Sequence, residues 1–175
     1  MLLEVMQQAT TNRAQDGYRR NVGIILFNNC NKVFWARRCG HDGWQFPQGG
    51  VRSNETLDQA MYRELNEEVG LDANHVKVIA RTQKWLRYDL PKVYLKKLRH
   101  KSNRNFKGQK QIWYLLELTG KESEVRLDIS CKPEFDQWVW KDWAVAVEEI
   151  IDFKKHVYRT AFQELKIYLP SSPLI

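Results

Sequence analysis

The chain has 175 residues, of which 43% are hydrophobic and 28% charged, and its formal net charge is +7. This is the length and composition of one soluble globular domain, and no stretch approaches the roughly 18 consecutive apolar residues of a membrane span. We therefore expect no membrane association. Residues 1–20 lack the basic-then-apolar layout of a secretory signal, so residence in the cytoplasm is the default expectation.

The three cysteines do not form a recognisable pattern. Cys30, Cys39 and Cys131 are odd in number, widely separated and without a histidine at ligand spacing. This argues against a disulfide framework and against a zinc site. We expect three reduced, partly buried thiols.

Apolar patterns taken in chain order predict a single domain that ends near residue 169, before a short tail at 170–175. Residues 21–27 and 33–36 predict a β-hairpin, and the glycines at 49 and 50 predict a mobile loop before a helix whose start is signalled by Ser53 or Asn54. Gly70 closes this helix as a C-cap residue. Further strands are expected at 76–81, 111–118 and 138–140, and a second helix at 152–169. This order predicts an α/β fold with a mixed sheet covered by helices.

The helix expected from about Thr56 to Val69 carries acids where an amphipathic helix would carry leucines. At about 100° per residue, Glu64 and Glu68 fall inside the apolar arc, and Glu67 lies just beyond its edge. Buried carboxylates need cationic partners, and convergent oxygen donors suit Mg²⁺ or Mn²⁺. The alternative is a surface glutamate cluster paired with Arg63, which the helical positions disfavour. The pattern predicts a metal-dependent hydrolase of polyphosphate anhydrides.

Basic residues concentrate in one segment. Between Arg81 and Lys110 the chain has eleven Lys or Arg residues and one acid, Asp89. The aromatic residues Trp85, Tyr88, Tyr94 and Phe106 lie among them. Aromatic faces beside cations are what single-stranded nucleic acid binds, although such a run can also be a solvated face without a partner. Because the segment joins two expected strands and is too long for a turn, it is a candidate functional loop that contacts RNA or polyphosphate.

Residues 49–71 match a known motif at all nine of its specified positions. Gly49, Glu55, Arg63-Glu64-Leu65, Glu67-Glu68 and Gly70-Leu71 reproduce the Nudix box, G-x5-E-x7-R-E-U-x-E-E-x-G-U with U aliphatic. The chain thus resembles the Nudix family, and the resemblance implies an α/β/α sandwich. It also implies that Glu64, Glu67 and Glu68 hold divalent metals, that the Gly49 carbonyl adds a ligand, and that Arg63 and Glu55 brace the loop and helix.

Seven further segments resemble the bacterial RNA pyrophosphohydrolases within that family. They are DGYR at 16–19, NVGI at 21–24, WARR at 35–38, WQFPQGG at 44–50, WLRY at 85–88, GQKQ at 108–111 and PEFD at 133–136. That group removes pyrophosphate from the 5′-triphosphate end of RNA, which commits messages to decay. The chain departs from the pattern at Arg20, where proline is expected, and at Gly43, where serine is usual. A third departure is an N-terminal extension at 1–15, before the single domain expected over residues 16–169.

The same resemblance implies further site residues. Glu134 would join the metal site, and Arg19 and Arg38 would hold the phosphates and leading nucleotides. Ile151 and Phe153 would offer apolar surface to a base, with Arg38 flanking it, and Gln48 and Lys110 would also bind the substrate. Phe153 could instead be the first buried residue of the C-terminal helix, in step with Val157 and Ala161.

The expected catalytic residues are Glu64, Glu68 and Arg63. Metal-held carboxylates would neutralise the anhydride, and either Glu68 or Glu64 would take the proton of the attacking water. Spacing does not distinguish these two acids. The expected substrates are 5′-triphosphorylated RNA or, alternatively, diadenosine polyphosphates. An inactive RNA-binding module is a different class of function, which the intact set of acids disfavours. The sequence identifies no protein partner.

Overall fold

A computed structural model of the chain describes residues 16–101 and 106–170, and the side chains up to residue 96 and again from 106. The expected extension at 1–15 and most of the expected tail lie outside these ranges. The elements in chain order are β1 (Tyr18–Phe27), β2 (Val33–Arg38), β3 (Trp44–Gln45), β4 (Gln48–Gly50), α2 (Leu57–Val69), β5 (Val76–Arg81), β6 (Leu86–Asp89), α3 (Lys92–Lys101), β7 (Gly108–Leu118), η1 (Glu122–Glu124), β8 (Phe135–Lys141), α4 (Trp143–Glu149), α5 (Asp152–Leu165) and η2 (Lys166–Tyr168).

The strands form one mixed sheet, as predicted. Its main path is β3-β2-β1-β7-β5, with β4 on β1, β6 on β7 and β8 on β2. β1 and β7 are parallel from Tyr18↔Gly108 to Phe27↔Glu117, and the other neighbouring strands in this order run antiparallel. The predicted hairpin is present at Phe27↔Val33. Further from the turn, β1 pairs with β4, whereas β2 pairs with β8. The two strands of the hairpin therefore diverge.

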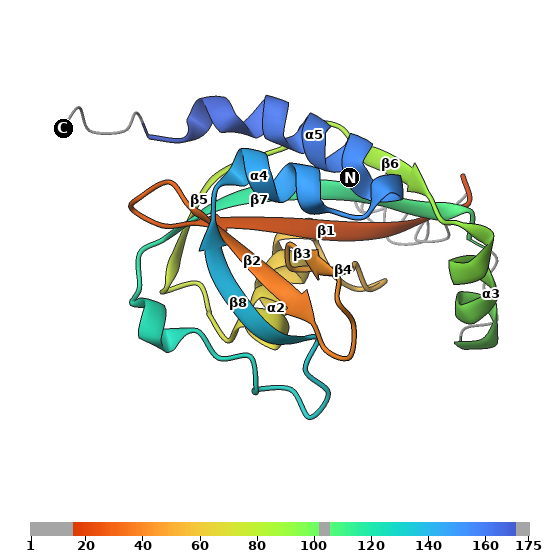
Figure 1. Ribbon diagram of the computed structural model, residues 1–175, viewed down its shortest axis with the longest axis horizontal. Coiled ribbons are helices and arrows are strands. Elements are labelled where there is room, and N and C mark those ends of the chain that lie inside the picture. Colours follow the sequence, from red (N-terminus) through yellow and green to blue (C-terminus); the bar gives the residue numbers. More distant parts are fainter. Residues whose placement is uncertain (1–15, 102–105, 171–175) are drawn as a thin grey trace, which may run out of the picture.

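Helices cover both faces of the sheet (Figure 1), with α2 on one side and α4 and α5 on the other. Each face has its own apolar core. Val22, Ile24 and Leu26 of β1 pack with the core under α2, whereas Ile25 and Phe27 pack with the core under α4 and α5. A strand that is buried on both faces reads as a continuous apolar run, which is how β1 appears in the sequence. The arrangement is the expected α/β/α sandwich.

Helix α2 has nearly the expected bounds of about Thr56 to Val69, but its N-cap is not Ser53 or Asn54, the residues expected to signal its start. Its N-cap is Thr56, whose hydroxyl accepts from the backbone N–H of Gln59 while the Gln59 side chain accepts from the Thr56 N–H. This reciprocal pair satisfies two N–H groups that a helix start leaves open. At the other end Gly70 has φ +78°, the left-handed C-cap conformation predicted for it.

Two segments expected to be loops are regular structure. Gln48–Gly50 is strand β4, because its backbone pairs with residues 21–23 of β1. The basic segment contains β6, which pairs with β7, and then helix α3, which begins just after Pro91. Proline fits a helix start because its missing N–H needs no partner there. The C-terminal α-helix ends at Leu165, and a 3₁₀ turn, η2, replaces the α-helix expected up to Leu169.

Two expectations from composition can be compared with these residues. None of the described helices is both long and apolar enough to cross a membrane. The cysteines are free thiols, but Cys30 and Cys131 are exposed and only Cys39 is half-buried. The expectation of partial burial was therefore wrong for two of the three.

Candidate functional site

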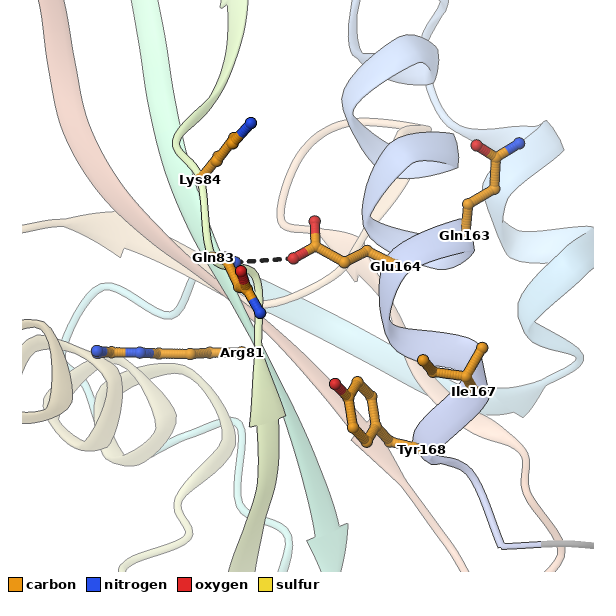
Figure 2. Close-up of a pocket in the computed structure, with 7 residues that line it drawn as sticks. All are labelled: Arg81, Gln83, Lys84, Gln163, Glu164, Ile167 and Tyr168. Atoms are coloured by element: carbon orange, nitrogen blue, oxygen red, sulfur yellow. Dashed lines mark hydrogen bonds between the residues drawn. The ribbon is translucent and has the colours of Figure 1, made fainter.

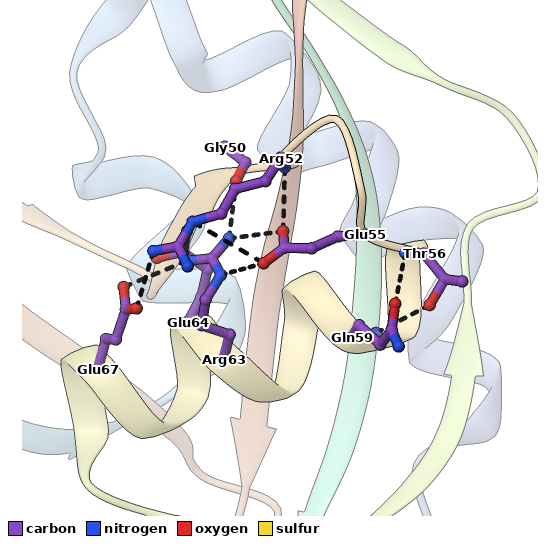
Figure 3. Close-up of polar contacts among 8 residues, drawn as sticks. All are labelled: Gly50, Arg52, Glu55, Thr56, Gln59, Arg63, Glu64 and Glu67. Atoms are coloured by element: carbon purple, nitrogen blue, oxygen red, sulfur yellow. Dashed lines mark hydrogen bonds and ion pairs between the residues drawn. The ribbon is translucent and has the colours of Figure 1, made fainter. Parts of the chain in front are cut away.

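Arg63 is the hub of the polar network on α2 (Figure 3). Its guanidinium donates to Glu55 at 2.5 and 3.0 Å, to Glu64 at 2.6 Å and to Glu67 at 3.2 Å, and its Nη2 also donates to the Gly50 carbonyl at 2.8 Å. The bond from Arg63 and burial act in opposite directions on Glu55, and the bond prevails, so its pKa is lowered. Arg63 thereby ties the helix to the strand β4 that precedes it. These are the contacts of a brace between loop and helix.

Glu64 lies against the backbone of Gly49. Its residue is 8% exposed, as its position in the apolar arc predicted. A Cβ built on Gly49 would lie 1.8 Å from the Glu64 Cδ, so only glycine permits this approach. Burial raises the pKa of Glu64 against the opposing effect of Arg63. The Gly49 backbone and the Glu64 carboxylate are therefore adjacent. Two ligands of a single cation would need to be this close.

Glu68 is the most strongly perturbed acid of the site. It is 9% exposed and accepts from the backbone N–H of Gln48 at 3.0 Å. Burial raises its pKa well above the ordinary value, and repulsion from Glu64 and Glu134 adds to the effect. Perturbed titratable groups of this kind gather at functional sites.

Glu67 and Glu134 complete the acidic set and are held by other arginines. Glu67 accepts from Arg52 at 3.1 Å as well as from Arg63, and Glu134 accepts from Arg38 at 2.9 Å. The described residues contain no group of three or more acidic, histidine or cysteine side chains close enough to hold a metal as they stand. The donors are all oxygens, the type that Mg²⁺ and Mn²⁺ prefer, so the chemistry fits such an ion although the side chains are turned to arginine.

The predicted phosphate-binding residues lie around β1, β2 and β7. The Arg19 guanidinium lies beside Gly50, where a Cβ would come within 2.2 Å of its Nη2. Arg38 is paired with Glu134. Lys110 donates to Asp16 at 2.8 Å and lies 5.6 Å from the centre of the Trp85 ring. Lys110 thus has an acidic partner that the sequence did not indicate.

The two residues predicted to offer apolar surface to a base, Ile151 and Phe153, differ in their exposure to solvent. Ile151 is 45% exposed at the start of α5. Phe153 is half-buried, and its ring packs on those of Tyr88 at 5.8 Å and Tyr94 at 5.3 Å. These contacts agree with the alternative interpretation, in which Phe153 is the first buried residue of the C-terminal helix. Base stacking by this ring stays a prediction.

Gln48 makes hydrogen bonds with both its backbone and its side chain. While its backbone N–H binds Glu68, its side chain donates to Gln45 at 3.2 Å and accepts from Gln111 at 2.7 Å. Gln45 Oε1 also accepts from the ammonium of Lys154 at 2.9 Å. Sequence reasoning missed Gln45, Gln111 and Lys154. A signal for Lys154 existed, because it shares one helical face with the buried Val157, Tyr158, Ala161 and Leu165.

A separate cleft of about 510 Å³ lies at the far end of α5 (Figure 2). It is lined by Arg81, Gln83, Lys84, Gln163, Glu164, Ile167 and Tyr168, and Glu164 closes one side by accepting from the Gln83 N–H at 2.8 Å. None of the predicted site residues lines it. The candidate site is therefore the carboxylate cluster of α2 and β4, not this cleft.

Comparison with known proteins agrees with the geometry. The family model described as the NUDIX domain matches residues 17–162. A protein of Legionella pneumophila (strain Corby) named RNA pyrophosphohydrolase is 55% identical over 150 residues, which cover 86% of this chain and 84% of that protein. The same holds for the protein of that name from the strain Lens.

Solved structures share the fold at low identity. The dihydroneopterin triphosphate pyrophosphohydrolase of E. coli superposes with a TM-score of 0.67 at 22% identity, over 87% of this chain and 99% of that one. An Ap4A hydrolase of C. elegans gives 0.62 at 15% identity, over 86% and 99%. The fold, the residues matched by the family model and the arrangement around Arg63 lead to one conclusion: the chain belongs to the Nudix hydrolase family.

Proposed function

We propose that this hydrolase removes pyrophosphate from the 5′-triphosphate end of RNA, leaving a 5′-monophosphate and promoting the decay of messages. The observation that carries the proposal is the pair of buried carboxylates, Glu64 and Glu68, packed against the glycine strand β4. The 55% identity with proteins named RNA pyrophosphohydrolase supports RNA as the substrate. Such a substrate implies residence in the cytoplasm.

Dependence on a divalent cation is general in the Nudix family, and we assign Mg²⁺ or Mn²⁺ to this site. Glu64, Glu67, Glu68, Glu134 and the Gly49 carbonyl would hold it. When bound, the ion supplies charge neutralisation for phosphate oxygens and a lowered pKa for water. The arginines that now pair with these acids would be released towards the phosphates. Arg52 and Arg38, which are exposed or half-buried, have room for this exchange.

Glu68 is the better proton acceptor of the two buried acids. Arg63 neutralises Glu64 at 2.6 Å, whereas the bond that Glu68 receives comes from a backbone N–H. A carboxylate with a raised pKa accepts a proton from water more readily at neutral pH. Arg63 acts on the reaction by holding Glu64 and the Gly50 carbonyl in place.

Arg19, Arg38, Gln48 and Lys110 would bind the phosphates and leading nucleotides, and Ile151 and Phe153 would face a base. Arg19 supports this role by lying close enough to Glu64 to lower the pKa of that acid. Arg38 lies close enough to α5 to lower the pKa of Lys154. Arg19 thus borders Glu64, and Arg38 borders Glu134 and the start of α5.

The test compares two substrates in the presence of Mg²⁺. A triphosphorylated RNA oligonucleotide and diadenosine tetraphosphate are supplied at equal concentration, and released pyrophosphate and nucleotides are measured. We expect faster turnover of the RNA. Faster turnover of diadenosine tetraphosphate would reverse the substrate assignment, and turnover of neither would leave a binding module.

A further inference from the structure

Lys154 is a buried cation that has no carboxylate in hydrogen-bond range among the residues described. The residue is 8% exposed, and its ammonium donates to Gln45 Oε1 at 2.9 Å and lies 6.0 Å from the centre of the Tyr88 ring. An ammonium group is costly to bury, and a residue of the same length such as methionine would fill the space without that cost. The charge at this position therefore needs a physical reason.

The ammonium fixes the direction of a row of amides. Lysine only donates, so Gln45 must present its oxygen to Lys154. Gln48 then presents its Nε2 to the same oxygen at 3.2 Å, which turns the Gln48 oxygen towards Gln111 Nε2 at 2.7 Å. The Gln111 oxygen is left buried with no hydrogen-bond donor among the described residues. The direction follows from the lysine end, because an ammonium group donates hydrogen bonds and cannot accept them.

The row ends at the β4 backbone, against which the carboxylates of α2 lie. Gln48 N–H binds Glu68 at 3.0 Å, and the next residue, Gly49, lies against Glu64. β4 pairs with β1 at three positions and Arg63 holds the Gly50 carbonyl, so the row adds to the contacts that fix this short strand. Gln48 connects the row to Glu68, because its side chain belongs to the row and its N–H donates to that carboxylate.

We propose that Lys154 is a positioning residue that, through Gln45 and Gln48, holds the β4 backbone in the geometry that orients Glu68 and Glu64 for a divalent cation. This rests on the proposed function only in taking those carboxylates as the cation site. Residues that orient a metal ligand through a second bond commonly change metal affinity by 10-fold to 100-fold when replaced. Lys154 acts two links further away, through Gln45 and Gln48, so we expect the lower end of that range.

The test measures Mn²⁺ binding to the full-length protein by isothermal titration, without any nucleotide. Lys154→Met should weaken Mn²⁺ binding about tenfold, and Lys154→Arg, which also only donates, should restore most of it. Gln45→Met cuts the same row and should cause a similar loss. Because the two residues act in series, the double variant should lose little more than either single one. Lys155→Met, next along the helix and paired with Asp152, is the matched control and should bind as the wild type does.

A second measurement needs no metal. The backbone amide of Gln48 should exchange its hydrogen faster in metal-free Lys154→Met than in the wild type, because the bond to Glu68 is less well held. Unchanged exchange and unchanged Mn²⁺ affinity in Lys154→Met would overturn the proposal, as would losses that add up in the double variant. If Lys154→Met does not fold, Gln45→Met decides by the same criteria, and Lys154→Arg should still bind Mn²⁺ nearly as the wild type does.

The outcomes separate this inference from the proposed function. A wild-type protein that binds Mn²⁺ but releases no pyrophosphate from RNA contradicts the substrate and leaves the role of Lys154 intact. A protein that hydrolyses RNA while Lys154→Met binds Mn²⁺ normally supports the function and rejects the role of Lys154.

Discussion

Single residues at this site are charged where packing alone would select apolar side chains. Glu64 and Glu68 on α2 and Lys154 on α5 lie on the buried faces of their helices. The acids were found from the sequence by their positions on the helix. The same test applied to residues 152–165 identifies Lys154, because this charged residue lies on the apolar face of its helix.

Replacing Glu64 by glutamine should abolish turnover and leave the fold intact. The change removes a proposed metal ligand, and it also removes a charge whose burial raises the pKa of the group. We therefore expect less than about a tenth of the wild-type rate, and unchanged or higher stability without metal. Pyrophosphate release and thermal unfolding in EDTA measure the two effects. Glu122→Gln, on the exposed turn η1, serves as the control, and a Glu64→Gln variant with normal turnover would remove Glu64 from the site.

Lys154 should give the stability of the protein an unusual dependence on pH. Burial and repulsion from Arg38 lower its pKa from 10.5 to about 8, against attraction by Glu134 and Glu68 and beside the Tyr88 ring. Between these values the unfolded chain binds the proton and the folded chain does not, so the free energy of unfolding rises with pH. Below about pH 8 the full cost of the buried charge, about 3 kcal/mol at most, is present.

Urea unfolding of the wild type and of Lys154→Met measures this effect. Methionine does not titrate, so Lys154→Met should exceed the wild type in stability at about pH 7, and the difference should shrink as the pH rises towards 10. The other ionisable groups are common to both proteins and cancel. A difference that stays constant with pH would mean that Lys154 keeps its ordinary pKa.

At the scale of elements, apolar periodicity was a good guide to most of the longer strands and helices. β1, β5, β7, β8 and α2 were predicted close to their observed bounds. Short strands were missed because their residues have no alternating pattern. For example, β4 consists of Gln48-Gly49-Gly50 and is a strand only because its backbone pairs with β1. Helix α3 was missed because its many basic residues obscure the apolar Val93-Tyr94-Leu95 segment that follows Pro91.

Since the basic segment contains a helix, its lysines can be removed without disturbing the backbone. Lys92 and Lys96 on α3 are exposed, and alanine favours a helix. Replacing both with alanine should weaken binding of single-stranded RNA and reduce its salt dependence by about 0.7 in log–log slope for each phosphate that is no longer neutralised. Binding at several salt concentrations measures this slope.

The control for this pair is Lys132→Ala, which lies in the loop before β8. Diadenosine tetraphosphate, too short to reach α3, should lose much less affinity than RNA. Equal losses for both substrates would indicate that α3 acts on the phosphates alone.

At the scale of the molecule, the sequence predicted the sandwich and the acids but not which arginine holds which acid. Pairs such as Arg38 with Glu134 or Lys110 with Asp16 join segments that are remote in sequence, so no local pattern reveals them. The buried row from Lys154 to Gln111 depends in the same way on how α5, β3, β4 and β7 come together.

Phe153 joins three parts of the molecule, because its ring on α5 contacts Tyr88 of β6 and Tyr94 of α3. Phe153→Ala should therefore lower stability by about 2 kcal/mol, less than a fully buried ring because Phe153 is half-buried. If the ring also stacks on a base, turnover should lose its increase from one to three nucleotides of RNA. A uniform decrease for all lengths would assign Phe153 to the fold alone. A wild-type rate that does not change with RNA length would contradict the RNA assignment.

The parallel pairing of β1 with β7 has a consequence for the order in which the protein is made. All nine specified positions of the Nudix box are synthesised by residue 71, but Gln48 acquires its partner Gln111 only once β7 has joined β1, and Gln45 acquires Lys154 later still. A nascent chain that stops before α5 contains every carboxylate of the site without the charge that directs the row. On the role proposed for Lys154, competence to hold a cation would arrive with α5 and not with the Nudix box.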